Sequence, residues 1–350
     1  MSVPEKINRN VLPIGIDLGT STIKISCHGT EFMIPSLIGE PNVGWGAGTL
    51  DKSLENNLIL IEGEEQWYVG ELARTQSEVQ RALASDGQMK SAEETFLALK
   101  AALALIIAKE DQDVVIATGV PVATSLEVMK NLSRMLKGHM EINVKNDATE
   151  KVERITCNIL KCLVLPEPYG TYYSTLKEKG EDEAVDTVLI DIGHGSTDIL
   201  TMHSGRPMRT ASGSLREATD TLTNRIAAKL QEKSNMIVKP FDLMMTIKKQ
   251  KETVMLGGQS YSIKAIKEHF TAAIAKVMVD EVIRLIATLP PDAFVEYYII
   301  CGGGAYTFGD AIKKAIIDGK LVSKPEAVII PDDPVMSNAK GFELISQSQQ

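Results

Sequence analysis

Asp191-Ile-Gly-His-Gly-Ser-Thr-Asp198 is a glycine-rich stretch with an acidic residue at each end, and it follows an apolar run from Val185 to Ile190. An apolar run of this length is typical of a buried β-strand. The two glycines allow a tight turn and a close approach to a ligand, and successive N–H groups in such a turn form an anion-binding concavity. An acidic residue that faces a phosphate needs a bridging cation such as Mg²⁺. Taken alone, the stretch is equally typical of an ordinary acidic β-turn.

A second copy of this pattern lies near the N-terminus, in Ile16-Asp-Leu-Gly-Thr-Ser-Thr-Ile-Lys24. It again consists of an apolar strand with an aspartate at its end, a turn of glycine and hydroxyl residues, and a second strand. Such internal repetition is a stronger signal than a single motif. A third glycine cluster, Cys301-Gly-Gly-Gly-Ala305, follows the apolar strand Tyr297–Ile300. Two hairpins of this kind could hold one polyphosphate from both sides.

These elements resemble those of the actin, Hsp70 and sugar-kinase ATPase superfamily, and within it the actin-like proteins. The resemblance rests on six stretches in the family's order, namely the first phosphate loop at Asp17–Lys24, a Phe-Pro-Ser-x-x-Gly-x-Pro-like segment at Ile34–Pro41, the first interdomain connection at Pro166–Pro168, the second phosphate loop at Asp191–Asp198, the adenosine loop at Ile300–Ala305 and the second connection at Ser337–Phe342. The matches run from residue 14 to residue 342 and so cover nearly the whole chain.

The resemblance implies an α/β fold of two actin-like domains, each a copy of a ribonuclease H-like unit, with a nucleotide cleft between them. Domain I is expected to comprise residues 1–185 and 335–350, with a small outer subdomain at about 31–90. Domain II is expected to comprise residues 186–334, with its outer subdomain at about 231–290.

Three carboxylates are the expected catalytic residues. In bacterial relatives a glutamate at the first connection orients the attacking water, and the resemblance gives this role to Glu167. Prolines on both sides of Glu167 fix the backbone and would hold its carboxylate in place. The alternative is an acidic side chain at a helix start, which the helix dipole stabilises by less than ~1 kcal/mol. Asp17 and Asp191 are expected to position Mg²⁺, largely through water, because Mg²⁺ gives up its waters reluctantly.

Further residues are expected to contact the nucleotide. Lys24 would present a point charge to the phosphates, although a lysine on a strand can equally be an ordinary surface residue. Gly213 precedes a predicted helix, and the first N–H groups of a helix bind anions well. The alternative, an ordinary serine N-cap at this helix start, is compatible with a nucleotide contact by Gly213. Lys248 falls where actins place a lysine near the nucleoside. The full expected set is Gly19, Thr20, Ser21, Lys24, Gly193, Gly195, Ser196, Gly213, Lys248, Gly302, Gly303 and Gly304.

The resemblance implies an ATPase, with GTP as an alternative substrate, whose Mg²⁺-dependent nucleotide cycle drives polymerisation into cytomotive filaments. The ending Ser337–Phe342 and the triple-glycine loop look most like plasmid-segregation actins and their archaeal relatives. We therefore expect plasmid partition through a DNA-binding adaptor protein. The alternatives are an archaeal or bacterial cytoskeletal actin without a plasmid role, and a non-polymerising small-molecule kinase. A kinase would need a catalytic aspartate, for which Asp198 and Asp220 are unpersuasive candidates.

Composition narrows the class of protein. The net charge of −9 and the pI of about 5.3 argue against direct binding of nucleic acid. The four cysteines lack the spacing of a zinc site, and we expect buried, reduced thiols in a cytoplasmic protein. Met1–Asn10 is too polar for a signal peptide. The longest apolar stretch, at about 98–108, is too short to cross a bilayer and contains Lys100.

Local patterns also predict secondary structure. A last strand is expected over 325–330. Trp45, in the glycine-rich segment 44–48, fits either an exposed contact loop or a hairpin with an inward-facing ring. Helices are predicted over 71–83, 91–109, 125–137, 215–230, 241–249, 264–289, 310–318 and 335–346.

Overall fold

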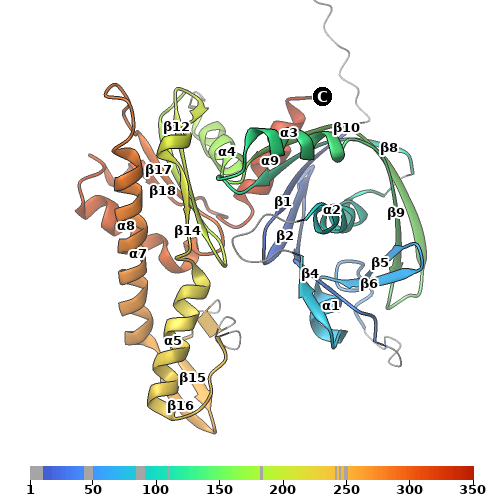
Figure 1. Ribbon diagram of the computed structural model, residues 1–350, viewed down its shortest axis with the longest axis horizontal. Coiled ribbons are helices and arrows are strands. Elements are labelled where there is room, and N and C mark those ends of the chain that lie inside the picture. The colour runs from blue at the N-terminus through green and yellow to red at the C-terminus, as the bar shows by residue number, and fades with distance from the viewer. Residues whose placement is uncertain are drawn as a thin grey trace, which may run out of the picture. The chain divides into compact units, whose positions relative to one another are not determined.

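The computed structural model of the 350-residue chain is shown in Figure 1. It describes residues 11–42, 50–83, 91–108, 110–181, 184–240, 243, 246–247 and 251–350. By their internal contacts the residues form two compact units, Met1–Thr175 with Asn338–Gln350, and Leu176–Ser337. We call them unit 1 and unit 2. The domain limits expected from the sequence, at 185/186 and 334/335, stay a prediction.

Unit 1 contains a ten-stranded sheet. Its strands are β1 (Leu12–Leu18), β2 (Thr22–Cys27), β3 (Thr30–Pro35), β4 (Leu37–Gly39), β5 (Leu58–Glu62), β6 (Glu65–Val69), β7 (Gln80–Ala82), β8 (Gln112–Val120), β9 (Gly138–Asn146) and β10 (Val152–Pro166). The strand order is β3-β2-β1-β8-β10-β9-β5-β6-β4-β7.

Unit 2 is built on a smaller sheet. Its strands are β11 (Thr187–Ile192), β12 (Thr197–His203), β13 (Arg206–Pro207), β14 (Gly213–Leu215), β17 (Tyr297–Cys301) and β18 (Val328–Ile329), and a separate hairpin is formed by β15 (Thr253–Leu256) and β16 (Gln259–Ser262). The main order is β13-β12-β11-β17-β18, and β14 adds to β12.

The first five strands of each sheet follow one plan. The hairpin pairs β1–β2 and β11–β12 are antiparallel, as are β2–β3 and β12–β13. The next neighbours on the other side, β8 and β10 in one unit and β17 and β18 in the other, are parallel. The predicted duplication and the mixed α/β class are therefore confirmed at the level of topology.

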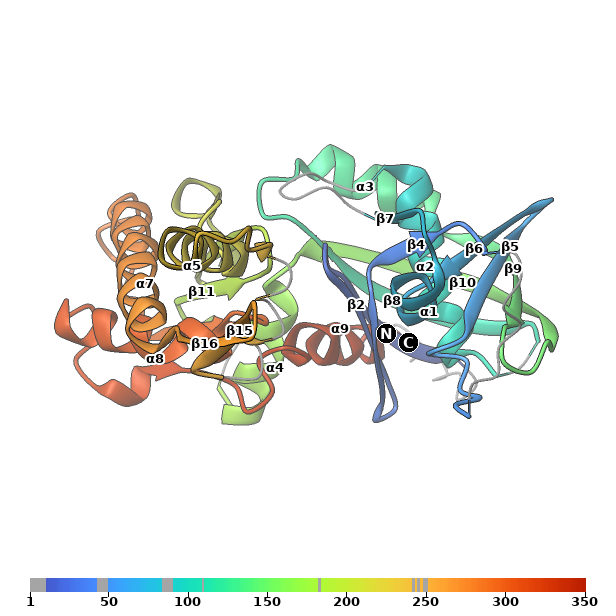
Figure 2. The same cartoon turned by 90° about the horizontal axis from the view of Figure 1, so that it is seen from below.

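Helices cover these sheets. In unit 1 they are α1 (Glu71–Gln76), α2 (Ala92–Ile106) and α3 (Leu126–Met135). In unit 2 they are α5 (Thr219–Ser234), α7 (Lys264–Ile286) and α8 (Ala305–Asp318). The division between the units falls within α4 (Tyr169–Lys179) and at the start of α9 (Ser337–Gln347). The sheet of unit 1 curves around α2, as Figures 1 and 2 show. Ser91 caps α2, in a capping box with Glu94. Among the described residues, no helix is both long and apolar enough to cross a membrane.

Close backbone packing fixes α9 in unit 1. A Cβ on Gly15 of β1 would lie 2.0 Å from the carbonyl oxygen of Ala339, so the helix rests directly on the strand. The buried carboxylate of Glu343 on α9 accepts hydrogen bonds from the Ser26 hydroxyl at 2.6 Å and from the His28 N–H at 2.8 Å. The closing helix is thereby tied to the β1–β2 hairpin, whose turn is the expected first phosphate loop.

Three helix predictions were wrong in their bounds. Over 310–318 the helix begins already at Ala305, directly after the triple-glycine loop. Over 71–83 the helix ends at Gln76, because the Ser77 hydroxyl bonds to the Glu40 and Val79 carbonyls and the chain continues as β7 beside β4. Over 215–230 the helix starts only at Thr219, because residues before it pair with β12 as β14.

Two further expectations need correction. The segment 325–330 contains a short 3₁₀ turn, Pro325–Ala327, before the two-residue strand β18. The outer part of unit 2 includes the β15–β16 hairpin, which was not among the elements expected from the sequence. Residues 44–48, including Trp45, and most of 241–249 lie outside the described residues.

All four cysteines are buried, lie in strands and are free thiols, as predicted. Burial, with a smaller effect of Glu343, raises the pKa of Cys27 to about 12. Burial alone raises the pKa of Cys162 to about 12 and that of Cys157 to about 11.

We therefore predict that the folded chain resists thiol reagents, because the thiolate is the reactive form. A colorimetric disulfide reagent at pH 8 should react with native cysteines at under about 1% of the rate of a free thiol. After unfolding in guanidinium, four equivalents should react at once. Rapid reaction of one equivalent with folded protein would contradict the burial.

Candidate functional site

The first hairpin holds an ion pair at the base of its turn. Asp17 on β1 lies opposite Lys24 on β2, and the lysine Nζ donates to Asp17 Oδ2 at 2.7 Å. The lysine and aspartate side chains are only 14% and 6% exposed, so Lys24 is not an ordinary surface lysine. The positive charge of Lys24 lies at the base of the turn. It is held there by Asp17, the aspartate that was expected to position Mg²⁺.

The turn Gly19–Ser21 joins these strands. A Cβ on Gly19 would lie 2.7 Å from the Thr22 carbonyl oxygen, so the turn requires glycine there. Thr20 is partly exposed and Ser21 is exposed. The Ser21 carbonyl accepts a hydrogen bond from the N–H of Ser36 at 3.0 Å, which ties the turn to the end of β3. The sequence motif around Ser36 contributed to the family resemblance, but this support for the loop was not predicted.

Glu167 lies at the same edge of the unit 1 sheet. Strands β1, β8 and β10 are parallel. The last residue pair is Ile16–Thr118 between β1 and β8, and Val120–Pro166 between β8 and β10. Asp17 directly follows Ile16 and Glu167 directly follows Pro166, so both residues sit at carboxyl ends of parallel strands. In open α/β sheets this edge is where ligands bind. The Glu167 N–H donates to the Val120 carbonyl at 2.8 Å, which fixes the backbone of the residue.

Gly119 is a further candidate site residue, which the sequence did not reveal. It sits on β8, the strand between those that carry Asp17 and Glu167. A Cβ at this position would lie 2.9 Å from both Cα and Cγ of Glu167, and 3.1 Å from the ring of Phe342. Because Gly119 has no side chain, Glu167 can occupy this space. Only the strand pairing reveals this role, because Gly119 and Glu167 are far apart in the sequence.

In the second hairpin, in unit 2, the last paired residues are five positions apart, as in the first hairpin, but the charges differ. Asp191 lies opposite Asp198, where the first hairpin has an aspartate opposite a lysine. Asp198 is buried and accepts a short hydrogen bond from the Ser214 hydroxyl. The turn closes through the Gly193 N–H, which donates to the Ser196 carbonyl at 2.9 Å. Gly195 is buried and Ser196 is partly exposed.

The start of α5 supports this second turn. The Thr219 hydroxyl donates to the Gly193 carbonyl at 3.0 Å, and the Asp220 N–H donates to the His194 carbonyl at 3.0 Å. Gly213 does not lie at the helix start as predicted. It belongs to β14 and pairs with Ile199 of β12, so its place beside a helix N-terminus was wrong.

The triple-glycine loop packs against the end of β11 within unit 2. Gly302 has φ +79°, and a Cβ there would lie 2.2 Å from Asp191 Oδ1 and 2.6 Å from the Ile192 carbonyl. The Gly304 N–H donates to the same carbonyl at 2.8 Å. Gly303 is exposed, and a Cβ on it would meet no atom within 4 Å. The structure thus brings Asp191 and the adenosine-loop candidates together, whereas Lys248 lies outside the described residues.

The donor set fits Mg²⁺ better than a metal with an all-protein site. No group of three or more His, Cys, Asp or Glu that could hold a metal occurs in the part of the chain that the structure describes. Mg²⁺ is usually held by one or two carboxylates together with water and substrate phosphates. Asp17 and Asp191, one at the end of each repeated strand, are the carboxylates that could serve in this way.

Comparisons with known families agree with this architecture. Residues 15–170 match the family described as the N-terminal domain of actin-like proteins, and residues 189–314 match the C-terminal domain of the archaeal, MreB-like actin homologues. The chain belongs to the actin-like protein family. The two matched regions contain the stretches Asp17–Lys24 and Asp191–Asp198 and the triple-glycine loop of this actin-like chain.

One relative by sequence is the actin-like protein MamK of Paramagnetospirillum magneticum strain AMB-1. It is 23% identical to this actin-like chain over 256 residues, which cover 71% of the chain and 63% of MamK. The match thus spans less than two thirds of MamK.

Solved structures of actin-like proteins have the same fold. The archaeal actin homologue Ta0583 has a TM-score of 0.75 at 20% identity, over 97% of this chain and 100% of Ta0583. Its complex with ADP has a TM-score of 0.74 at 19% identity, over 97% and 100% of the two chains. A subunit of a 15-stranded ParM filament from Clostridium botulinum has a TM-score of 0.74 at 19% identity, over 97% and 99%. At these identities the likeness establishes the fold.

Proposed function

We propose that this chain is a nucleotide-dependent, polymerising actin-like ATPase that forms cytomotive filaments for plasmid DNA segregation. The observation that carries the proposal is the duplicated hairpin, in which Asp17 and Asp191 end equivalent strands. The ADP complex of Ta0583 and the filament of Clostridium botulinum ParM support nucleotide binding and self-association as properties of proteins with this fold. The plasmid role rests on the resemblance of Ser337–Phe342 to segregating actins.

In this proposal the chain binds ATP, or GTP, through its two turns. Backbone N–H groups of the turns and the hydroxyls of Thr20, Ser21 and Ser196 hold the phosphates. Lys24 adds positive charge near the first turn, and its ion pair with Asp17 holds the lysine side chain in one position. Gly302, Gly303 and Gly304 leave room for the nucleoside. The proposed set also retains Gly19, Gly193, Gly195, Gly213 and Lys248, each from the family resemblance.

Glu167 accepts the proton of the attacking water and orients it toward the γ-phosphorus. Its backbone is fixed by Val120 and its side chain lies against Gly119, so little reorganisation is needed during the reaction. Asp17 and Asp191 would hold Mg²⁺, largely through water, and the bound ion would neutralise charge on the transferred phosphoryl group. Hydrolysis then limits the lifetime of the filament, and a DNA-binding adaptor protein links the filament to its cargo in the cytoplasm.

A cytoskeletal filament without a plasmid role is the second candidate. It is favoured by the match of residues 189–314 to the archaeal, MreB-like family and by the likeness to Ta0583. A small-molecule kinase has less support, because Asp198 is buried against Ser214 and Asp220 lies in the first turn of α5.

The proposal is tested by light scattering at 90° on purified protein with Mg²⁺ and ATP, GTP or no nucleotide, followed by negative-stain microscopy. We expect scattering to rise only with a triphosphate, and chelation of Mg²⁺ to abolish both assembly and phosphate release. Phosphate transfer to a small acceptor, without filaments at any protein concentration, would overturn the proposal in favour of a kinase.

A further inference from the structure

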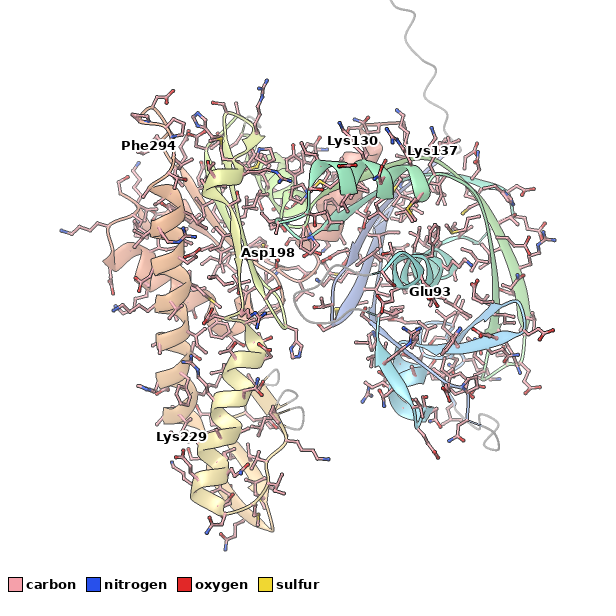
Figure 3. All side chains as sticks on the ribbon, in the orientation of Figure 1. Glu93, Lys130, Lys137, Asp198, Lys229 and Phe294 are labelled. Carbon is pink, nitrogen blue, oxygen red and sulfur yellow. The ribbon has the colours of Figure 1, made fainter. Side chains whose placement is uncertain are left out.

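The outer face of α3 in unit 1 carries three cations. Lys130 and Arg134 are four residues apart, and Lys137 follows three residues after Arg134, so the three side chains lie near one face of the helix. The helical turn extends past Met135, since the Lys137 N–H donates to the Arg134 carbonyl at 3.4 Å. All three cations are exposed, and Figure 3 shows Lys130 and Lys137 along α3. We call Lys130, Arg134 and Lys137 the cationic strip.

Packing of the opposite face of α3 holds the cationic strip outward. Met129 is buried, and Leu132 and Leu136 pack in the hydrophobic core of unit 1. The Ser133 hydroxyl donates a hydrogen bond to the Cys162 carbonyl of β10. The helix is therefore fixed on the sheet, and the strip faces solvent.

The cationic strip has no partner of opposite charge among the described residues. None of its three cations forms an ion pair there, whereas Arg154 of β10, which is also exposed, pairs with Glu141 at 2.6 Å. The one acidic residue of α3 is Glu127, in the first turn, where the helix dipole stabilises a carboxylate. The strip thus keeps its positive charge in a chain whose net charge is −9.

Two exposed apolar side chains border the strip. Leu126 is 63% exposed and Met135 is 49% exposed. Because an α-helix has about 3.6 residues per turn, Leu126 lies beside Lys130 on one side and Met135 lies beyond Arg134 on the other. A single exposed apolar side chain is ordinary on a protein surface. Here, however, two of them lie on either side of a cationic face.

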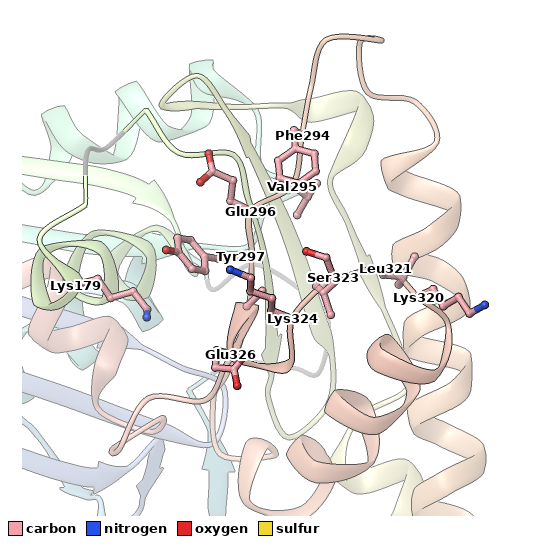
Figure 4. Close-up of a pocket in the computed structure, with 12 residues that line it drawn as sticks. Lys179, Phe294, Val295, Glu296, Tyr297, Lys320, Leu321, Ser323, Lys324 and Glu326 are labelled. Atoms are coloured by element: carbon pink, nitrogen blue, oxygen red, sulfur yellow. The ribbon is translucent and has the colours of Figure 1, made fainter.

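The cavity of unit 2 offers no such uniform charge. Its volume is about 840 Å³, and its lining includes Lys179, Lys320 and Lys324 together with Glu296 and Glu326, as Figure 4 shows. Because both charges are present, the charge of the cavity does not favour one class of ligand. The strip on α3 carries one sign of charge and therefore favours an anionic partner.

We propose that the cationic strip binds the surface of an anionic lipid membrane. Each Lys or Arg near such a surface strengthens binding roughly fivefold, so three of them contribute roughly 100-fold. The acidic charge elsewhere on the chain opposes this only weakly, because exposed charges farther away than the Debye length of about 8 Å are largely screened.

The apolar borders favour a membrane over nucleic acid as the anionic partner. At a membrane surface, cations contact the headgroups while apolar side chains enter the boundary with the acyl chains. Leu126 and Met135 could do so on both sides of the strip. Beside the phosphates of a nucleic acid they would stay in water and add nothing to binding.

This inference goes beyond the proposed function and does not depend on it, because a single chain carries the whole strip. A filament would present many strips to one membrane, and its overall affinity would exceed that of a single chain. The membrane contact would then confine assembled chains to a surface.

Flotation of the purified protein with lipid vesicles tests the inference, without nucleotide so that assembly plays no part. The wild type should float with vesicles of equal parts phosphatidylglycerol and phosphatidylcholine, and not with vesicles of phosphatidylcholine alone. Raising the salt concentration from roughly 50 to roughly 500 mM should release it, because the Debye length falls. Equal binding to both kinds of vesicle, or to neither, would overturn the inference.

Neutralising the strip tests its location. The triple variant Lys130→Gln, Arg134→Gln and Lys137→Gln should bind anionic vesicles roughly 100-fold more weakly. Its thermal unfolding should match that of the wild type, because the replaced side chains are exposed. The matched control changes the net charge equally, by glutamine at three exposed lysines of unit 2, namely Lys233, Lys239 and Lys276. This control should bind like the wild type, and equal binding by the strip variant would show that the strip is not the site.

The apolar borders distinguish a membrane from nucleic acid. Leu126→Ser with Met135→Ser keeps all three cations and should weaken binding to anionic vesicles roughly fivefold. A fluorescent DNA duplex is tested in parallel with the wild type and the strip variant. If the wild type bound the duplex but not the vesicles, and the strip variant bound neither, the strip would be a nucleic-acid surface and the proposal would be wrong.

Discussion

Replacing Glu167 with glutamine is expected to slow nucleotide hydrolysis by about 10²–10³-fold and to leave nucleotide-dependent assembly intact, since general-base catalysis contributes an effect of this size. Glutamine has nearly the same shape, so the contact with Gly119 and the hydrogen bond to Val120 remain. It cannot accept the proton of the attacking water. Filaments of this variant should therefore form at the wild-type concentration and disassemble much more slowly.

The measurement is phosphate release at saturating Mg²⁺–ATP, recorded with light scattering on the same sample. Glu178→Gln is a matched control, because Glu178 is an exposed carboxylate on α4, the helix that follows Glu167. It should hydrolyse at the wild-type rate. If the Glu167→Gln variant hydrolysed ATP at the wild-type rate, Glu167 would have no catalytic role. It would then be only an acidic residue at a helix start, which is the alternative that the sequence also allowed.

Gly119→Ala provides an independent approach to the same question. Its methyl group would enter the space 2.9 Å from Cα and Cγ of Glu167, so the carboxylate must move. Misplacement of a catalytic group by about 1 Å can cost up to roughly 100-fold in rate. We expect slow hydrolysis with Glu167 still present, and nucleotide affinity close to that of the wild type. This pattern would separate positioning of the carboxylate from loss of the nucleotide site.

The sequence was most informative where the signal is local. An apolar run followed by an aspartate and a glycine turn identifies a strand and its loop without knowledge of any neighbour, and this pattern located both hairpins. An apolar run followed by a glycine cluster located the triple-glycine loop in the same way. The capping box of α2 is equally local, because Ser91 and Glu94 are three residues apart. The order of these elements supported the family resemblance, and the resemblance implied the duplicated topology.

Contacts between distant segments could not be read in this way. Ser212-Gly213-Ser214 resembles a helix cap, but pairing with β12 draws Gly213 into a strand and delays α5 to Thr219. This is a case in which tertiary pairing overrides local propensity. The ion pair of Lys24 with Asp17 follows from hairpin register, and the role of Gly119 follows from two strand pairings. The ion pair requires the exact register of the hairpin, and the role of Gly119 requires the order of the strands in the sheet.

Replacing Gly302 with alanine is expected to lower nucleotide affinity roughly 10- to 100-fold, which corresponds to a distortion of about 1–3 kcal/mol. Two effects combine at this position. The backbone has φ +79°, a conformation that alanine adopts with strain. The new Cβ would also lie 2.2 Å from Asp191 Oδ1 and 2.6 Å from the Ile192 carbonyl. Either the loop or Asp191 must shift, and both belong to the proposed nucleotide site.

Gly258→Ala separates these two effects. Gly258 lies in the β15–β16 turn with φ +80°, but no atom lies within 4 Å of a Cβ there. Both variants should lose about 1 kcal/mol of stability from the backbone strain alone, measured by thermal unfolding without nucleotide. Only Gly302→Ala should lose affinity in a titration with a fluorescent ATP analogue. Equal affinities for the two variants would mean that the approach of Gly302 to Asp191 does not shape the nucleotide site, and the triple-glycine loop would then need another role.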